Sequence, residues 1–204
     1  MSKKVSHKFY RRCFRFAGPV IRFFRPIEVV GRENIVNGPA LICGNHSAMI
    51  DPFLIALALG VDMQVRVIAK ISLFKIPVVS TVLWKLGMIP VDRSTLDVSS
   101  VKSSLTYLKS GDKVVIFPEG TRVSSYDATA AKNGAVKLAE RAKVPIMPVF
   151  MPREKPFFKK SKVIFGEPYS IEKLAEKRSG EDYEVLSVEL MEKIQGLDGS
   201  TFDK

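Results

Sequence analysis

The stretch ALICGNHSAMIDPFLIALAL, residues 40–59, joins two apolar runs through a polar loop. The first run, Ala40 to Cys43, has the length and composition of a buried strand. The second follows Asp51-Pro52 and extends from Phe53 to Leu59, and proline is favoured at the first position of a helix. The stretch therefore predicts a strand, a loop and a helix, the unit from which α/β sheets are built.

The loop carries His46, one of two histidines in the chain, five positions before Asp51. Histidine can take up a proton near neutral pH, and a carboxylate against its other ring nitrogen would fix the tautomer and stabilise the imidazolium. Such a pair needs no serine or cysteine nucleophile if the substrate brings its own hydroxyl. The residues alone also allow Asp51 to be the N-cap of the helix and His46 to be a hydrogen-bonded core residue.

Length and composition predict one folded domain with an anionic partner. The 204 residues are 46% hydrophobic and 26% charged, which excludes a disordered chain. The formal charge of +11 suits nucleic acid, a membrane surface, or a phosphorylated or acidic substrate. Cys13 and Cys43 form no disulfide framework or metal motif, which favours a reducing cytoplasm. Arginines interrupt every candidate signal peptide, and no apolar run is long enough to span a bilayer, so we expect surface contact with any membrane.

The amino-terminal segment is basic and aromatic. Residues 3–25 contain eight lysines and arginines, no acidic residue and six aromatic residues. At helical spacing one stripe, mainly aromatic, is formed by Phe9, Cys13, Phe16, Val20 and Phe23 and widened by Tyr10, Phe14 and Ile21. The basic residues occupy the remaining arc, as in helices that lie on anionic membranes. Gly18-Pro19 predicts a break into two short helices. The alternative is a surface helix with a solvated basic rim. The residues expected to contact the membrane are Phe9, Arg11, Arg12, Phe16, Arg22 and Phe23.

After Pro26, short apolar runs alternate with helical patterns, which predicts an α/β fold with a single mixed, mostly parallel sheet flanked by helices. We expect residues 1–25 to form two membrane-docking helices, 26–195 the α/β domain and 196–204 a flexible tail. Strands are predicted at residues 27–30, 40–43, 64–69, 88–91, 113–117, 146–151 and 162–165. Helices are predicted from residue 51 and at residues 73–86, 98–109, 132–143 and 182–194. The basic loop PREKPFFKKSK, residues 152–162, is either a second membrane-contacting edge or a solvated turn.

Three further clusters fall at the ends of predicted strands, where ligands of such sheets gather. They are LGMIPVDR at residues 86–93, FPEGTR at 117–122 and VPIMPV at 144–149. Gly120 would let backbone amides approach a ligand, and Arg93 and Arg122 offer planar forks suited to phosphate. Lys70, at the end of its strand, could add a point charge. Taken singly, Asp92-Arg93 could equally be a salt-bridged turn, Glu119 a partner for either arginine, and Pro118-Gly120 a turn.

The four blocks together, in this order from about Val30 to about Val149, resemble the motifs of the lysophospholipid and glycerophosphate acyltransferase family. The basic aromatic amino terminus is similar to the membrane-docking helices of bacterial 1-acylglycerol-3-phosphate acyltransferases. The resemblance implies that His46 is the general base for the acceptor hydroxyl and that Asp51 orients it. It implies no covalent acyl-enzyme. The residues that it associates with the glycerol phosphate are Arg93, Glu119, Gly120 and Arg122, with Lys70 and Lys132 nearby.

One position departs from the family pattern. Many members carry serine two positions after the histidine, whereas this chain has Ala48 there and Ser47 one place earlier. We therefore assign no catalytic role to Ser47. The proposed base and its carboxylate are unaffected.

The resemblance implies transfer of a fatty acyl chain from acyl carrier protein or acyl-CoA to lysophosphatidic acid, giving phosphatidic acid, without cofactor or metal. The expected partners are an anionic membrane surface, the acyl donor and the lysophospholipid, with no nucleic acid. The expected place is the cytoplasmic face of the cell membrane, as a peripheral protein. One alternative is the same chemistry on glycerol 3-phosphate, another lysophospholipid or an acylamino acid. The other is a non-enzymatic basic module that binds lipid or nucleic acid.

Overall fold

The structure, a computed structural model, describes residues 7–92, 97–122, 125–171 and 178–199. In these residues seven strands form one sheet in the order β1-β7-β6-β2-β5-β3-β4. Neighbouring strands are parallel except β6 and β7, which are antiparallel. The predicted single, mixed, mostly parallel sheet is confirmed. The strands are β1 Ile27–Val30, β2 Ala40–Gly44, β3 Val65–Lys70, β4 Ile89–Val91, β5 Lys113–Ile116, β6 Ile146–Phe150 and β7 Ser161–Phe165.

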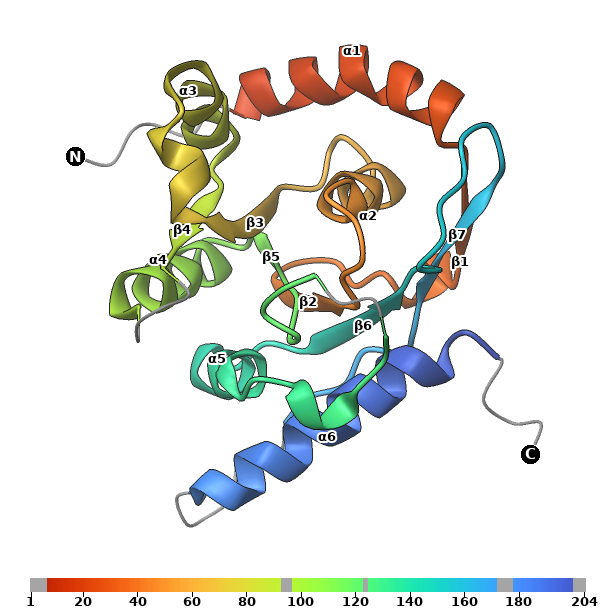
Figure 1. Cartoon of the computed structure of the whole chain (residues 1–204). Coiled ribbons are helices and arrows are strands. Elements are labelled where there is room, and N and C mark those ends of the chain that lie inside the picture. Colours follow the sequence, from red (N-terminus) through yellow and green to blue (C-terminus); the bar gives the residue numbers. More distant parts are fainter. Residues whose placement is uncertain (1–6, 93–96, 123–124, 172–177, 200–204) are drawn as a thin grey trace.

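Helices cover both faces of the sheet (Figure 1). One buried apolar cluster joins α1, α2 and α3 to the sheet, and a second joins α4, α5 and α6 to its other face. Both faces of the central strands are therefore buried, which is why β2, with the sequence ALICG, is apolar throughout. The helices are α1 His7–Phe24, α2 Asp51–Leu59, α3 Pro77–Leu86, α4 Val98–Lys109, α5 Gly134–Ala142 and α6 Gly180–Gly196.

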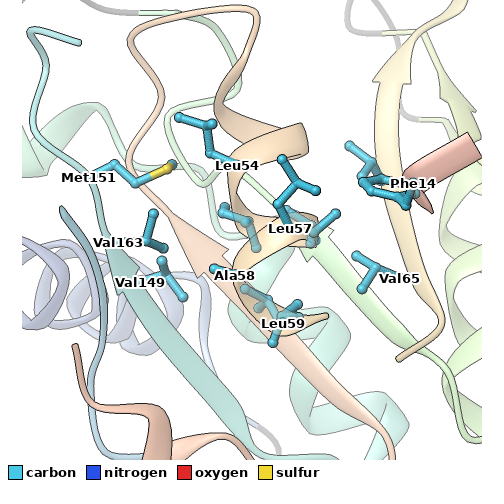
Figure 2. Close-up of a cluster of buried hydrophobic side chains, with 14 of the residues drawn as sticks. Phe14, Leu54, Leu57, Ala58, Leu59, Val65, Val149, Met151 and Val163 are labelled. Atoms are coloured by element: carbon cyan, nitrogen blue, oxygen red, sulfur yellow. The ribbon is translucent and has the colours of Figure 1, made fainter. Parts of the chain in front are cut away.

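Helix α2 is buried on nearly every side. Seven of its nine residues are buried, and its apolar side chains surround the helix instead of forming one stripe. In Figure 2 its side chains lie between Phe14 of α1 and Val149 of β6. Helix α2 is thus held between α1 and the sheet, and its first residue, Asp51, is fixed with it.

The amino-terminal segment contains one continuous helix from His7 to Phe24, with Pro19 inside it. The predicted break into two short helices at Gly18-Pro19 is therefore wrong for these residues. Pro19 has no N–H for the Arg15 carbonyl, but both residues are exposed, so water can replace that hydrogen bond. Gly18 is buried, and a Cβ there would lie 3.0 Å from Leu57 of α2. The glycine serves close packing of two helices.

The predicted aromatic stripe of α1 divides between the core and the surface. Tyr10 and Phe14 are buried against α2 and α3, whereas Phe16 and Phe23 are 72% and 67% exposed. Phe9 is only partly buried against the core. Two of the basic residues contact the rest of the chain, since Arg11 forms an exposed ion pair with Asp62 and Arg22 donates to the Leu57 carbonyl at 3.0 Å. Arg12 is exposed.

The helix predicted for residues 73–86 begins later than expected. A 3-10 turn covers Ile71–Lys75, and α3 starts at Pro77. Proline is favoured there because the first N–H groups of a helix have no partner within it. Further 3-10 turns span Arg32–Asn34 and Ala128–Ala130. In the described residues, no helix has both the length and the apolar character needed to cross a bilayer.

The register brings three loops to one edge of the sheet. Strand β2 pairs with β5 on one side and β6 on the other, with Cys43 opposite Ile116 and Gly44 opposite Val149. All three strands are parallel, so their carboxyl ends meet at the same edge. The loops that begin at Asn45, Phe117 and Met151 therefore leave the sheet side by side.

Candidate active site

His46 and Asp51 form a buried pair at this edge. His46 Nδ1 and Asp51 Oδ2 are 3.0 Å apart, with side-chain exposures of 10% and 0%. The same Oδ2 accepts the backbone N–H groups of Ser47 and Ala48, each at 2.8 Å. Asp51 is the first residue of α2 and Ile50 is its N-cap, so the N-cap interpretation of Asp51 is wrong. The carboxylate binds the loop that carries His46, and not the amides of its own helix.

Asp51 is held as a carboxylate. Burial raises its pKa, but hydrogen bonds from His46, Ala48 and Ser47 and the charge of Lys155 outweigh burial and leave the pKa below its ordinary value. The His46 ring also stacks on Phe117, with ring centroids 4.1 Å apart and planes inclined by 18°. The imidazole is thus fixed by an ion at one nitrogen and by an aromatic face.

Glu119, from the FPEGTR turn, meets the same loop. Its Oε2 accepts the backbone N–H of His46 at 2.7 Å. Burial raises its pKa, and the His46 N–H and the Arg153 charge oppose that rise. Arg153 approaches Oε1 at 3.8 Å, which is longer than a hydrogen bond. Glu119 therefore positions the backbone at His46.

The loop after β6 supplies four contacts that the sequence did not indicate. Asn45 donates to the Met151 carbonyl at 2.7 Å and accepts the Met151 N–H at 2.9 Å. The Lys155 ammonium lies 3.0 Å from Asp51 Oδ1 as an ion pair outside hydrogen-bond geometry. It also donates to Ser47 Oγ at 2.7 Å. The charge of the loop was visible in the sequence, but its proximity to His46 was not.

Two of the predicted phosphate-contacting residues lie together in the structure. Gly120 adopts a left-handed backbone conformation with φ 70°, and a Cβ there would lie 3.0 Å from the Lys132 side chain. Lys132 and Arg122 are exposed. Lys70 is exposed at the end of β3, opposite Val91 of β4. Arg93 lies outside the described residues.

A cavity of about 400 Å³ opens beside this turn, between the ends of β3, β4 and β5 and helices α4 and α5. Its polar lining comes from Asp92, Asp97, Ser100, Ser104, Gly120, Lys132, Asn133 and Lys137. The remaining lining is largely apolar and includes Ile68, Val101, Ile116, Phe117, Ala135 and Leu138. The residues of the VPIMPV cluster lie mostly within β6, and Ile146, Met147 and Val149 are fully buried there.

In the part of the chain that the structure describes, no group of three or more histidine, cysteine, aspartate or glutamate residues could hold a metal ion. The chemistry open to the site is proton transfer by His46, supported by Asp51, beside a basic turn and an apolar cavity.

Comparison with known proteins gives the class. A family model described as "Acyltransferase" matches residues 26–152, more than half of the chain. The chain belongs to this acyltransferase family, as its motifs predicted, and is therefore an enzyme.

Individual relatives carry a more specific name than the family model does. The chain is 31% identical over 196 residues to the 1-acyl-sn-glycerol-3-phosphate acyltransferase of Bacillus subtilis, covering 93% of this chain and 96% of that protein. It is 32% identical over 148 residues to the protein of that name in Borreliella burgdorferi, covering 71% of this chain and 58% of that one. The solved structure of PlsC, the 1-acyl-sn-glycerophosphate acyltransferase of Thermotoga maritima, has a similar fold, with a TM-score of 0.61 at 23% identity over 97% of this chain and 80% of that one.

Proposed function

We propose that this enzyme transfers a fatty acyl group from acyl carrier protein or acyl-CoA to the free hydroxyl of lysophosphatidic acid, giving phosphatidic acid. The observation that carries the proposal is the buried His46–Asp51 pair at 3.0 Å, in a chain whose relatives carry the name of that reaction. Family membership argues against the non-enzymatic basic module.

The pair supports a direct transfer of the acyl group to the acceptor hydroxyl. Because Asp51 holds Nδ1, Nε2 is the nitrogen that would meet the acceptor hydroxyl. His46 takes the hydroxyl proton as the oxygen attacks the thioester carbonyl, and Asp51 stabilises the imidazolium. When the tetrahedral intermediate collapses, the carbon–sulfur bond breaks and His46 returns the proton to the departing thiolate. The products are an ester and a free thiol, and no acyl-enzyme forms.

Phosphate and acyl chain have separate places near this pair. We place the acceptor phosphate at the Gly120 turn, with Lys132 and Arg122 as its cations and Lys70, Arg93 and Glu119 as further binding or positioning residues. The apolar cavity beside Phe117 suits a fatty acyl chain, because it begins at the polar turn and continues between α4 and α5. The acceptor is an amphiphile and the donor is a thioester of an acyl chain, so the site needs both polar and apolar lining.

A membrane surface supplies such an acceptor. The exposed side of α1 presents Phe16 and Phe23, and Arg12 is also exposed. Phe23 and Phe24 contact Phe158 of the loop after β6, with ring centroids 5.8 and 5.5 Å apart. We propose that these residues, with Phe157, enter the interface of an anionic bilayer at the cytoplasmic face of the cell membrane.

Phe158 has the backbone conformation of a residue under constraint. Its φ is 60°, a region that bulky residues rarely adopt. Its N–H donates to the Phe24 carbonyl at 2.9 Å, and the Arg25 guanidinium lies 3.9 Å from the Phe157 ring centroid. These contacts hold the exposed phenylalanines of the loop beside those of α1, as one docking surface requires.

The direct test is product identification. Purified protein is incubated with a radiolabelled acyl donor, either acyl-CoA or acyl carrier protein, and a panel of acceptors on anionic vesicles. We expect labelled phosphatidic acid from lysophosphatidic acid. Transfer only to glycerol 3-phosphate, another lysophospholipid or an acylamino acid would reassign the acceptor, and the absence of transfer to lysophosphatidic acid would refute the proposal.

A further inference from the structure

Lys155 is a buried cation aimed at the carboxylate of the proposed catalytic pair. Its side chain is 2% exposed, and its ammonium meets Asp51 Oδ1 at 3.0 Å and Ser47 Oγ at 2.7 Å. Ser47 Oγ in turn donates to the Arg153 carbonyl at 3.3 Å. Lys155 is therefore tied to the His46 loop and to its own loop at the same time.

The two oxygens of Asp51 have different partners. Oδ2 accepts from His46, Ser47 and Ala48, whereas Oδ1 faces the Lys155 ammonium. Burying a carboxylate costs free energy of folding unless an opposite charge and hydrogen bonds compensate the loss of its hydration. The lysine compensates the oxygen that the backbone does not reach.

We infer that Lys155 is a positioning residue: it fixes the plane of the Asp51 carboxylate from the side opposite His46 and offsets part of the negative charge of that carboxylate. This inference rests on the proposed function of the pair. The Lys155 ammonium offsets part of the negative charge that Asp51 presents to His46, so Asp51 attracts a proton on His46 less strongly than an unpaired carboxylate would. Ser47 has a place in this arrangement as the second acceptor for the ammonium.

Other charges act on the same two groups. His46 meets Asp51 from α2 and Glu119 from the turn after β5. Lys155 is influenced by Arg153 of its own loop and by Arg25 at the end of α1. Burial lowers the pKa of Lys155, and the Asp51 carboxylate opposes that fall. The effect of removing Lys155 must therefore be measured on His46 itself.

The chain makes that measurement simple because His7 and His46 are its two histidines. Isotope-labelled histidine gives two ring signals by NMR, and His7→Gln assigns them. In Lys155→Met the midpoint of the His46 titration should move to higher pH, since an uncompensated carboxylate retains the neighbouring proton. Lys159→Met removes an exposed cation of the same loop and should leave the midpoint in place.

Activity gives the second measurement. Lys155→Met should lower kcat at neutral pH by about 10- to 100-fold, the range found for partners that orient the ligands of metal sites. The acidic limb of the pH profile of kcat should move to higher pH together with the titration midpoint of His46. KM for the acceptor should change little. Loss of stability alone would lower the amount of active protein without moving either pH curve.

Lys155→Gln keeps a hydrogen-bond donor without the charge, and it serves if the methionine variant does not fold. An unchanged His46 midpoint in both variants would overturn the inference. If the wild-type protein transfers no acyl group, the proposed function fails, but the NMR titration still decides whether Lys155 acts on the pair. If transfer occurs and the midpoint does not move, the inference about Lys155 fails alone.

Discussion

The loop after β2 and the loop after β6 leave the sheet at the same edge and meet at one carboxylate, yet they differ in how sequence reveals them. His46 and Asp51 lie five residues apart on the first loop and the helix that follows it. Lys155, on the second loop, lies 108 residues from Ser47, which it contacts. The two residues of the proposed catalytic pair are therefore close in the sequence, whereas the charged residue that supports them is brought there only by the fold. The two loops should therefore respond differently to substitution.

Loss of His46 should have the largest effect on activity. His46→Ala removes the proposed base, so kcat should fall by about 10²- to 10⁴-fold. Acyl transfer from a radiolabelled donor to lysophosphatidic acid measures it. The variant should still partition to anionic vesicles, because the exposed phenylalanines of α1 are unchanged. Turnover close to that of the wild type would remove His46 from the mechanism.

The contact between the two loops through Asp51 should contribute to the free energy of unfolding. Asp51→Asn leaves Lys155 buried without its counter-charge, and breaking a buried ion pair from one side costs about 3–5 kcal/mol in the free energy of unfolding. Urea unfolding of both single variants and of Asp51→Asn/Lys155→Met measures the coupling. The double variant should be more stable than the sum of the two single losses predicts. Additive losses would mean that the two side chains do not depend on each other.

The sequence predicted what depends on neighbouring residues. Strand β2 is apolar because both its faces are buried, and α4 occupies the predicted residues 98–109 because Asp97 caps it and Gly111 follows it. The order of strands in the sheet was not predicted. It depends on which apolar faces pair, and apolar runs of similar composition do not specify their partners.

The errors arise where contacts outside the helix or the loop itself decide the structure. Pro19 predicts a break, but the exposed position of Arg15 and the packing of Gly18 on Leu57 let the helix continue. Asp51 has the signature of an N-cap, but its carboxylate binds the His46 loop instead. Lys155 belongs to a run of basic residues that composition assigns to the surface. For Pro19 and Lys155 a residue distant in the sequence, Leu57 or Asp51, decides the outcome, whereas for Asp51 the loop three to five positions earlier does.

The outer part of the loop after β6 should act on membrane binding and not on the chemistry. Phe157→Ser with Phe158→Ser removes two side chains that are 60% and 62% exposed. Vesicle partition should weaken about tenfold or more, because burying one phenylalanine contributes about 1.5–3 kcal/mol. Co-sedimentation with anionic vesicles measures it, and transfer to a detergent-dispersed acceptor should change little.

Val185→Ser is the matched control for this pair, since Val185 is 58% exposed on α6, which packs on the other face of the sheet. It should leave partition unchanged. Equal loss in both proteins would show general surface hydrophobicity, and not a docking surface. Deletion of residues 1–25 is a poorer test, because it would also remove Tyr10 and Phe14 from the core.

The smallest effect concerns Glu119, which joins the two loops through the His46 backbone and the Arg153 side chain. Burial raises its pKa above the ordinary 4.5, so between that value and the raised one the folded protein binds more protons than the unfolded chain. The free energy of unfolding should therefore fall as pH rises through this interval. Glu119→Gln keeps an oxygen acceptor for the His46 N–H and removes the titration. Its stability relative to the wild type should rise across the same interval, by less than about 1.4 kcal/mol for each unit of pKa shift. Urea unfolding between about pH 4 and pH 7 measures the difference, and parallel curves would mean that Arg153, although 3.8 Å away, fully compensates the buried carboxylate.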